Sequence, residues 1–229
     1  MRHHWTRQSA ERLIFAQVEK GGMGCNLVAL LGSPRQEGNT AKLLQEAVRG
    51  AEEAGCSVEV IHVPRLQIRP CMEIFACKTK AECAIKDDME TYYTKIRDAD
   101  GLIVATPVMT MGVPGALKSF LDRFQVFYMA KYERGEPLVT PKERKIRKML
   151  LLSIAGMNIP NLFAGLLQTM HAFGEITDCP LWKKVLLPDM DNVRDITTRP
   201  EVLKEAYEKG YALGEEIQKS KSEVALSME

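Results

Sequence analysis

The sequence predicts a doubly wound α/β fold: a parallel sheet of five strands with helices on both faces. Short apolar runs of strand length alternate along the chain with longer amphipathic segments, the pattern of strands joined by helical crossovers. The first run, Asn26 to Leu31, is almost continuously apolar, as expected for a strand buried on both faces. The 229 residues, 45% of them hydrophobic, suffice for one domain with a substantial core.

The strands are expected where short apolar runs end in polar turns. Lys and Arg are absent from the runs that begin at Asn26, Gly101 and Met149, whereas the second and fifth runs are less apolar. With right-handed crossovers, the strands give a flavodoxin-like sheet of order 2-1-3-4-5. The expected strands are residues 26–31, 57–63, 101–105, 149–153 and one within 175–187.

The helices are expected where apolar residues recur at helical spacing. Leu43, Leu44 and Ala47 begin the apolar face of the first helix, which Gly55 ends, and Pro114 suits the first position of a later one. The segments 65–86 and 131–148 have no clear periodicity. The expected helices are residues 40–55, 88–98, 114–127, 160–173 and 201–219.

The domain boundaries are expected at both ends of this pattern. Residues 1–22 form an N-terminal extension that ends in Gly21-Gly22, residues 23–220 form the domain, and residues 221–229 form a flexible tail. The extension lacks the continuous apolar core of a signal peptide. The protein is therefore expected in the cytoplasm.

The charge balance excludes two classes of partner. Lys and Arg total 31 against 30 for Asp and Glu, so no electrostatic argument favours nucleic acid or an anionic membrane. The longest strongly apolar stretch, Met149 to Met157, is much shorter than a membrane span.

The turn after the first strand, Gly32-Ser-Pro-Arg-Gln-Glu-Gly-Asn-Thr40, is a candidate phosphate-binding loop. The start of the following helix offers unpaired N–H groups and the positive end of the helix dipole. Arg35 adds a charge, and Ser33, Asn39 and Thr40 add side-chain donors. The alternative is an ordinary turn in which Asn39 or Thr40 caps the helix.

The loop GSPRQEGNT resembles the GSPR-x-x-GNT loop of the NADPH-dependent FMN reductase and iron–sulfur flavoprotein superfamily. Further similarity follows in order: Pro70-Cys71 through Asp87-Asp88-Met89, then Thr106-Pro107-Val108, then Pro114 to Arg123. The resemblance covers roughly residues 25–190. It implies that flavin mononucleotide (FMN) binds outside the carboxyl ends of the strands, where doubly wound sheets hold ligands.

The resemblance also implies which loops hold FMN. The phosphate would lie on the first loop, and the isoalloxazine ring along the loops after the third and fourth strands. Met109 stands where the family often has an aromatic residue; the alternative is that Met109 and Met111 are core residues. The expected FMN-binding residues are Ser33, Arg35, Gly38, Asn39 and Thr40, then Pro107, Val108, Met109, Thr110, Met111 and Gly112, then Ser153, Ala155 and Gly156.

Three of the six cysteines, Cys71, Cys77 and Cys83, lie in one short segment. A chain of this size without an export signal needs no disulfide framework, so they indicate metal or redox chemistry, or inert thiols. Against the four-cysteine motif of iron–sulfur flavoproteins they match the first, third and fourth ligands. Ile74 stands at the second position and cannot bind iron, so an iron–sulfur cluster is doubtful. A fourth ligand would have to come from elsewhere in the fold or from a partner subunit. Cys56 and Cys179 are candidates by their chemistry alone.

The resemblance implies an FMN-dependent NAD(P)H oxidoreductase that moves electrons to an unidentified acceptor. No catalytic side chain is expected, because the cofactor carries the chemistry. One alternative is a flavin electron carrier without its own small substrate, and another is a regulatory module that has lost the cofactor. The family implies a homodimer or homotetramer, with residues 124–148 and the extension as candidate contacts, and a redox partner protein is a further expectation.

Overall fold

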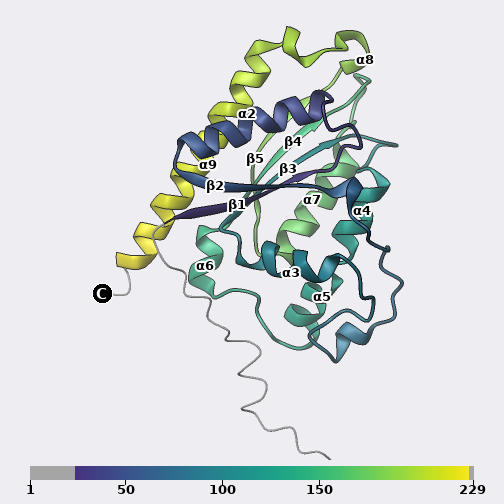
Figure 1. Ribbon diagram of the computed structural model, residues 1–229, viewed down its shortest axis with the longest axis vertical. Helices are drawn as coiled ribbons and strands as arrows, with labels where there is room; N and C mark the ends of the chain where they lie inside the picture. Colours follow the sequence, from purple (N-terminus) through teal and green to yellow (C-terminus); the bar gives the residue numbers. More distant parts are fainter. Residues whose placement is uncertain (1–23, 227–229) are drawn as a thin grey trace, which may run out of the picture.

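The computed structural model describes residues 24–226, so the expected extension over residues 1–22 lies outside the described residues. Its five strands form one parallel sheet in the order β2-β1-β3-β4-β5, which confirms the predicted order (Figure 1). The strands are β1 (Cys25–Leu31), β2 (Cys56–His62), β3 (Gly101–Pro107), β4 (Lys148–Ile154) and β5 (Leu181–Leu187).

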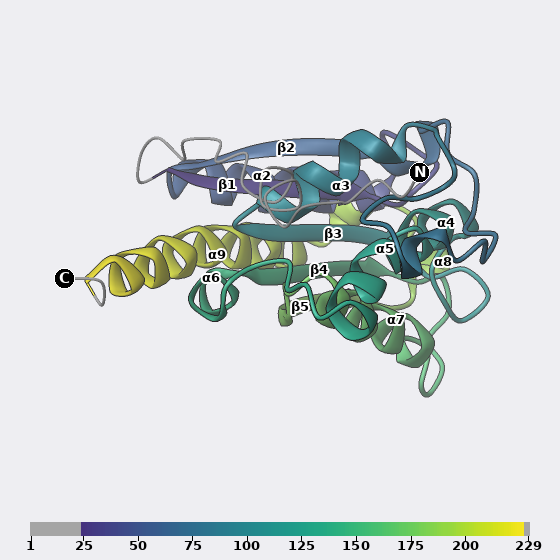
Figure 2. The same ribbon diagram turned by 90° about the horizontal axis from the view of Figure 1, so that it is seen from below.

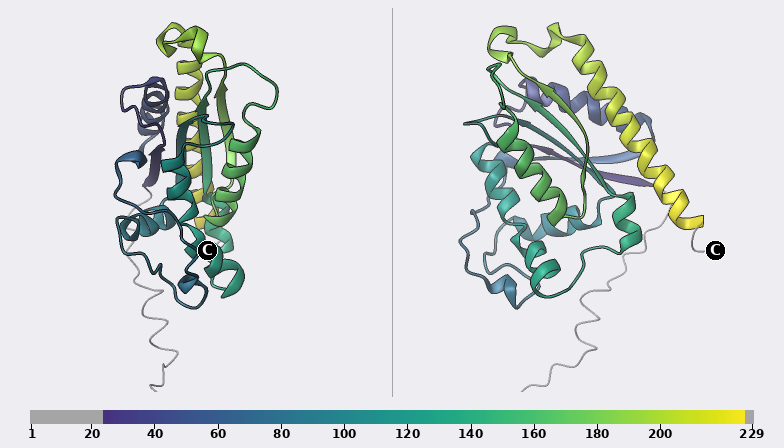
Figure 3. Two further views of the ribbon diagram at one scale, coloured as in Figure 1. Left: turned by 90° about the vertical axis from the view of Figure 1, so that its right-hand side faces the viewer. Right: turned by 180° about the vertical axis from the view of Figure 1, so that it is seen from behind.

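Helices cover both faces of this sheet, as Figures 2 and 3 show from three directions. Alternate residues of one strand point to opposite faces, so Ile103 packs in the core on one face and Val104 in the core on the other. The first face is covered by α2 (Asn39–Glu53) and α9 (Pro200–Leu226). The second is covered by α3 (Met89–Asp98), α4 (Gly115–Asp122), α5 (Gln125–Tyr128) and α7 (Ala164–Ile176).

The helices α2 and α9 cross with their backbones in contact (Figure 1). A Cβ atom on Gly210 would lie 2.0 Å from the carbonyl oxygen of Ala47, and one on Gly50 would lie 2.2 Å from that of Tyr207. Only glycine allows two helices to approach this closely. The crossing fixes α2, which begins at the candidate phosphate-binding loop, against α9.

Residues 221–226 differ from the expected flexible tail over residues 221–229, of which residues 227–229 lie outside the described residues. Helix α9 continues to Leu226, beyond the predicted end at Lys219. Lys221 holds this last part, because its Nζ donates to Asp100 Oδ2 (2.7 Å) and to the carbonyl of Gly24 (2.6 Å). Residues 221–226 are therefore part of the domain.

The predicted helix 114–127 is two helices, α4 and α5, separated at Arg123 and Phe124. Both side chains are fully buried. The irregular segment 131–148 contains a further short helix, α6 (Pro141–Ile146), with a capping box between Thr140 and Glu143. No helix in the described part of the chain is long and apolar enough to cross a membrane.

A disulfide joins Cys25 to Cys56, which the sequence did not predict. The two residues are register partners at the amino ends of neighbouring parallel strands. This geometry brings together two cysteines that are 31 residues apart in sequence. The bridge lies at the opposite edge of the sheet from the loops that follow the strands.

Candidate functional site

A cavity of about 370 Å³ lies at the carboxyl edge of the sheet, outside the ends of β1, β3, β4 and β5. This is the edge at which ligands bind in doubly wound folds. It brings together residues from all three loops that the sequence singled out, together with residues after β5. Its lining residues are Arg35, Asn39, Pro107, Val108, Ile154, Ala155, Gly156, Met190, Asp191 and Arg194.

The first loop turns tightly around the buried hydroxyl of Ser33. The backbone N–H of Arg35 donates to Ser33 Oγ (3.2 Å), and that of Gly38 donates to the Arg35 carbonyl (3.3 Å). His62, at the end of β2, supports the loop from behind, with Nε2 2.7 Å from the Ser33 carbonyl oxygen. A Cβ atom on Gly32 would come within 2.6 Å of Leu117 Cδ2, so a larger residue where the loop leaves β1 would require Leu117 to move.

Helix α2 starts at this loop without a cap. Its N-cap residue, Gly38, makes no side-chain capping bond, and its first turn carries no acidic residue. By contrast, Thr140 caps α6. The first N–H groups of α2 therefore have no side-chain partner, and an anion can satisfy them.

The two polar side chains of the loop that line the cavity have different surroundings. The Asn39 amide is bonded at both ends: Nδ2 donates to the Arg194 carbonyl (2.7 Å), and Oδ1 accepts from the Ile196 N–H (3.1 Å). The exposed guanidinium of Arg35 has no hydrogen-bond or ion-pair partner among residues 24–226. Arg35 is thus available to a ligand, whereas Asn39 joins the first loop to the segment after β5.

The loop after β3 provides one apolar wall of the cavity through Pro107 and Val108. Beyond them, Met109 and Gly112 exchange two backbone hydrogen bonds of 3.0 Å across Thr110 and Met111, both with positive φ (49° and 61°). The side chains of Met109 and Met111 are 44% and 42% exposed. They are not core residues, so that alternative is wrong; nor do they line the cavity, and they lie on the exposed loop beyond it.

The loop after β4 lines the cavity through Ala155 and Gly156, while Ser153 does not reach it. Ser153 is buried, and its hydroxyl donates to the Thr106 carbonyl (2.8 Å), which joins β4 to β3. A Cβ atom on Gly156 would lie 2.5 Å from the carboxylate oxygens of Asp191. Glycine at 156 therefore lets Asp191 approach the backbone at the cavity.

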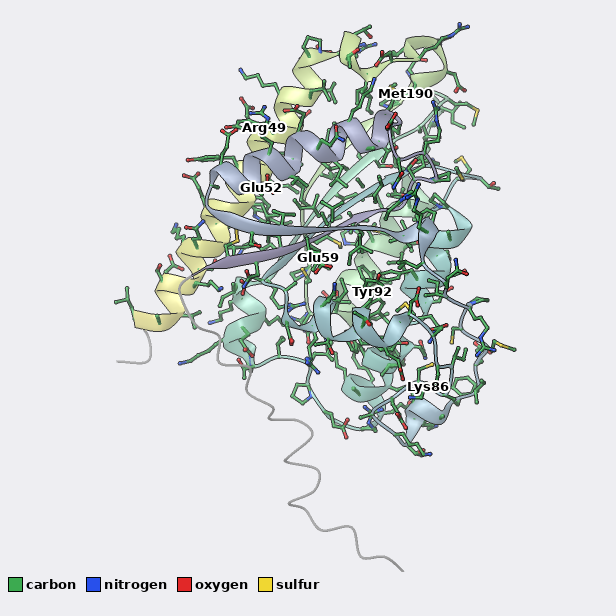
Figure 4. All side chains as sticks on the ribbon, viewed as in Figure 1. Arg49, Glu52, Glu59, Lys86, Tyr92 and Met190 are labelled. Atoms are coloured by element: carbon green, nitrogen blue, oxygen red, sulfur yellow. A yellow bond between two sulfur atoms is a disulfide. The ribbon has the colours of Figure 1, made fainter. Side chains whose placement is uncertain are left out.

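The segment after β5 is the part of the site that sequence reasoning missed. Its short helix α8 (Met190–Val193) lies beside the start of α2, where Figure 4 labels Met190. The N–H groups of Met190 and Asp191 donate to the carbonyls of Ala155 and Gly156, both at 3.0 Å. No sequence motif marks this segment. The general rule that sites lie at carboxyl strand ends, applied to the fifth strand, would have pointed to it.

The cysteine segment lies on the second face of the sheet and is held by Arg123. Its guanidinium donates to the carbonyls of Arg69 (2.8 Å) and Ile85 (3.1 Å), on either side of the cysteines, and to Asp87 Oδ2 (2.6 Å). Burial raises the pKa of the Cys77 thiol, and the thiols of Cys83 and Cys71 raise it further. The segment is thus anchored by protein contacts at both ends.

The three thiols do not form a metal site. Over residues 24–226, no three His, Cys, Asp or Glu side chains lie close enough together to hold a metal ion. Of the two candidates for a fourth ligand, Cys56 is bonded to Cys25, and Cys179 is fully buried in the core of the second face. The residues present do not fit an iron–sulfur cluster.

Residues 25–158 of this chain, more than half of it, match the model of the NADPH-dependent FMN reductases. The chain belongs to this family. The resemblance seen in the loop GSPRQEGNT is confirmed, and FMN is the family's cofactor. The FMN reductase match contains the first three loops of the cavity and ends before the segment after β5.

Several curated proteins of this superfamily are similar to the chain over their shared part. An iron–sulfur flavoprotein of Methanocaldococcus jannaschii is 37% identical over 97 residues, 42% of this chain and 50% of that protein. The NADPH-dependent FMN reductase of Escherichia coli is 33% identical over 96 residues, 42% of this chain and 46% of that protein. The chain thus spans about half the length of the curated relatives it matches.

Solved structures share the fold of this FMN reductase family member. An NAD(P)H:quinone oxidoreductase from Methanothermobacter marburgensis superposes with a TM-score of 0.63 at 22% identity, covering 83% of this chain and 99% of that one. An FMN-dependent NADH-azoreductase from Bacillus anthracis in complex with FMN gives 0.59 at 11% identity, covering 83% and 100%.

The cavity fits FMN by the chemistry of its donors. The uncapped start of α2 and the unpartnered Arg35 suit a phosphate, which is dianionic or nearly so at neutral pH. Pro107, Val108 and Ile154 form an apolar surface next to them, suited to an aromatic ring.

Proposed function

We propose that this protein is an FMN-dependent NAD(P)H oxidoreductase that passes electrons to an acceptor still to be identified. The observation that carries the proposal is the cavity itself, in which a cationic, phosphate-suited end and an apolar end meet at the carboxyl edge of a parallel sheet. Membership of the FMN reductase family supports it.

The residues of the first loop hold the phosphate in this proposal. Gly38 and Thr40 belong to the uncapped start of α2, Ser33 lies in the loop before it, and Arg35 supplies a charge-assisted contact. Pro107 and Val108 pack against the ring, while the backbone of Ala155 and Gly156 borders its polar edge. FMN supplies hydride and electron transfer when it is bound, and the protein binds and orients it.

The test is to purify the protein, record its visible absorption spectrum and follow NADPH and NADH oxidation with FMN and an artificial acceptor present. We expect flavin absorbance, or binding of added FMN, together with nucleotide oxidation. Because the cysteines do not fit a cluster, an iron assay on anaerobically prepared protein is expected to give no stoichiometric iron. A colourless protein that binds no added FMN would contradict the proposal.

A flavin electron carrier is the second candidate, and one observation favours it. Met109, Met111 and Met157 are exposed on the loops after β3 and β4. Adaptable thioether side chains on an exposed surface suit contact with a partner protein. A carrier would bind FMN but oxidise NADPH and NADH negligibly, so the same assay separates the two candidates.

Assembly as a homodimer or homotetramer in the cytoplasm completes the proposal. Tyr128 and Tyr132 lie within residues 124–148 and are exposed, and their rings contact each other in a tilted arrangement with centroids 4.8 Å apart. Exposed aromatic pairs are typical of contact surfaces between proteins. Sedimentation of the full chain, compared with a Tyr128→Ser/Tyr132→Ser variant, tests whether this pair lies in a subunit contact.

A further inference from the structure

Arg194 lies on the wall of the cavity contributed by the segment after β5. Its exposed guanidinium, like that of Arg35, has no hydrogen-bond or ion-pair partner within residues 24–226. Other arginines of the same part of the chain pair with carboxylates, among them Arg49, Arg134 and Arg144. The charged side chains that line the cavity are these two guanidinium groups and the carboxylate of Asp191, so its lining carries a net positive charge, which suits an anion with several acceptor oxygens.

The backbone at Arg194 has a conformation that few residues adopt. Its φ and ψ are 61° and −47°, and the N–H of Asp195 donates to the Val193 carbonyl at 2.7 Å. Arg194 is thus the central residue of a γ-turn with positive φ, which is rare and strained. Such conformations persist only where surrounding contacts hold them.

Those surrounding contacts come mainly from Asn39. Its amide donates to the Arg194 carbonyl and accepts from the N–H of Ile196, a fully buried residue. A second connection runs from Lys42, one turn further along α2, to Asp195 at 2.9 Å. The helix whose first turn borders the cavity therefore also fixes the turn that carries Arg194.

We propose that Arg194 is a second cationic contact for the phosphate of FMN, opposite Arg35, and that Asn39 is the residue that positions it. In this arrangement Asn39 acts on the phosphate through the γ-turn, because its amide nitrogen and its amide oxygen each bond to the backbone of the segment that carries Arg194. The inference rests on the proposed FMN site.

The experiment compares FMN with riboflavin, which has the same ring but no phosphate. Both are titrated into the flavin-free full chain, and quenching of flavin fluorescence gives the affinities. For Arg194→Ala we expect FMN to bind about tenfold more weakly or worse, since charge-assisted phosphate contacts are worth this much. Riboflavin affinity is expected to stay the same. Arg194→Lys keeps the charge and is expected to retain part of the FMN affinity.

The matched control is Arg199→Ala, which removes the same charge five residues further on. Arg199 does not line the cavity, and its guanidinium lies 3.9 Å from Glu201. We expect this variant to bind FMN like the wild type. A loss equal to that of Arg194→Ala would mean that net charge, rather than a specific contact, explains the effect, and would overturn the inference.

The role of Asn39 is tested by a double-mutant cycle. If Asn39 acts through Arg194, Asn39→Ala weakens FMN binding, and the double variant is no weaker than Arg194→Ala alone. Additive losses would show that Asn39 contacts the ligand independently. Unchanged FMN affinity in Arg194→Ala would overturn the whole inference, whereas a wild-type chain that binds neither flavin would contradict the proposed function instead.

Discussion

Arg35 and Asn39 are neighbours in the same loop, yet the structure gives them different roles. The Arg35 side chain lines the cavity and has no hydrogen-bond or ion-pair partner among the described residues 24–226, whereas the Asn39 amide bonds to the backbone after β5. The sequence pattern suggested that both bind phosphate. Only the three-dimensional neighbours of Asn39 reveal that its amide is bonded to the segment after β5.

Replacing Arg35 by Ala should weaken FMN binding by about tenfold or more, because one charge-assisted phosphate contact contributes about 1.5–3 kcal/mol. Riboflavin binding should change little. Isothermal titration of both ligands into flavin-free protein provides the measurement. An equal loss for the two flavins would place Arg35 at the ring rather than at the phosphate.

The carboxylate of Asp191 lies against Gly156, at the part of the cavity expected to face the ring. A negative charge near the ring opposes the addition of electrons. Asp191→Asn should therefore raise the reduction potential of bound FMN, by on the order of 30 mV, which is ~1.4 kcal/mol for a two-electron couple. Spectroelectrochemical titration of the two proteins measures this shift, and a lower potential in the variant would contradict the placement.

At the scale of elements, the contact between α2 and α9 holds in place the helix that begins at the cavity. Gly210→Ala would force a Cβ atom against the Ala47 carbonyl, 2.0 Å away, so the helices must separate. We expect the free energy of unfolding to fall by about 2 kcal/mol, typical of overpacking a tight contact. Urea denaturation measures it.

Gly115→Ala is the control for this variant, because a Cβ atom there meets nothing within 4 Å. It lies in the first turn of α4, where alanine is expected to be neutral or slightly stabilising. Equal destabilisation by the two variants would show that the α2–α9 crossing is not specially tight.

The connection between α2 and the segment after β5 has a defined pH range. Hydrogen bonds from the backbone of Thr197, and then from Lys42, lower the pKa of Asp195 from 3.8 to about 2. The stabilisation of the folded state by the ionised Asp195 carboxylate is therefore fully present above pH 3.8 and is lost as the pH falls through about 2. At neutral pH the connection is intact, and NMR titration of the Asp195 carboxyl carbon checks the midpoint. A midpoint near 4 would show that the connection does not form in solution.

For the whole molecule, the Cys25–Cys56 disulfide closes a loop of 31 residues at the edge of the sheet away from the cavity. Cys25→Ser/Cys56→Ser should lower the free energy of unfolding by about 3 kcal/mol, because the open chain gains conformational freedom. FMN affinity should be unchanged, since the bridge and the cavity lie at opposite edges. Thermal denaturation and FMN titration of the same variant test both statements.

The sequence predicted the sheet and its order because short apolar runs are a local feature and right-handed crossovers are a general one. It could not predict the end of α9, which depends on Lys221 reaching Asp100, nor the break between α4 and α5 around the buried Arg123. The sequence also could not predict the disulfide or the hydrogen bonds of the Asn39 amide. Each joins residues more than 30 positions apart, which no local pattern records.

The crossing of α2 and α9 has a consequence for motion. Helix α2 starts at the cavity, contacts α9 and is hydrogen-bonded to Arg194 and Asp195. From these residues the chain continues through the single 3-10 turn of residues Ile196–Thr198 into α9. Helix α2, helix α9 and the turn at Arg194 and Asp195 are therefore each joined to the other two, so local unfolding of one disrupts contacts of the others. We expect amide hydrogen exchange to report one shared opening free energy for them, raised together when a flavin binds.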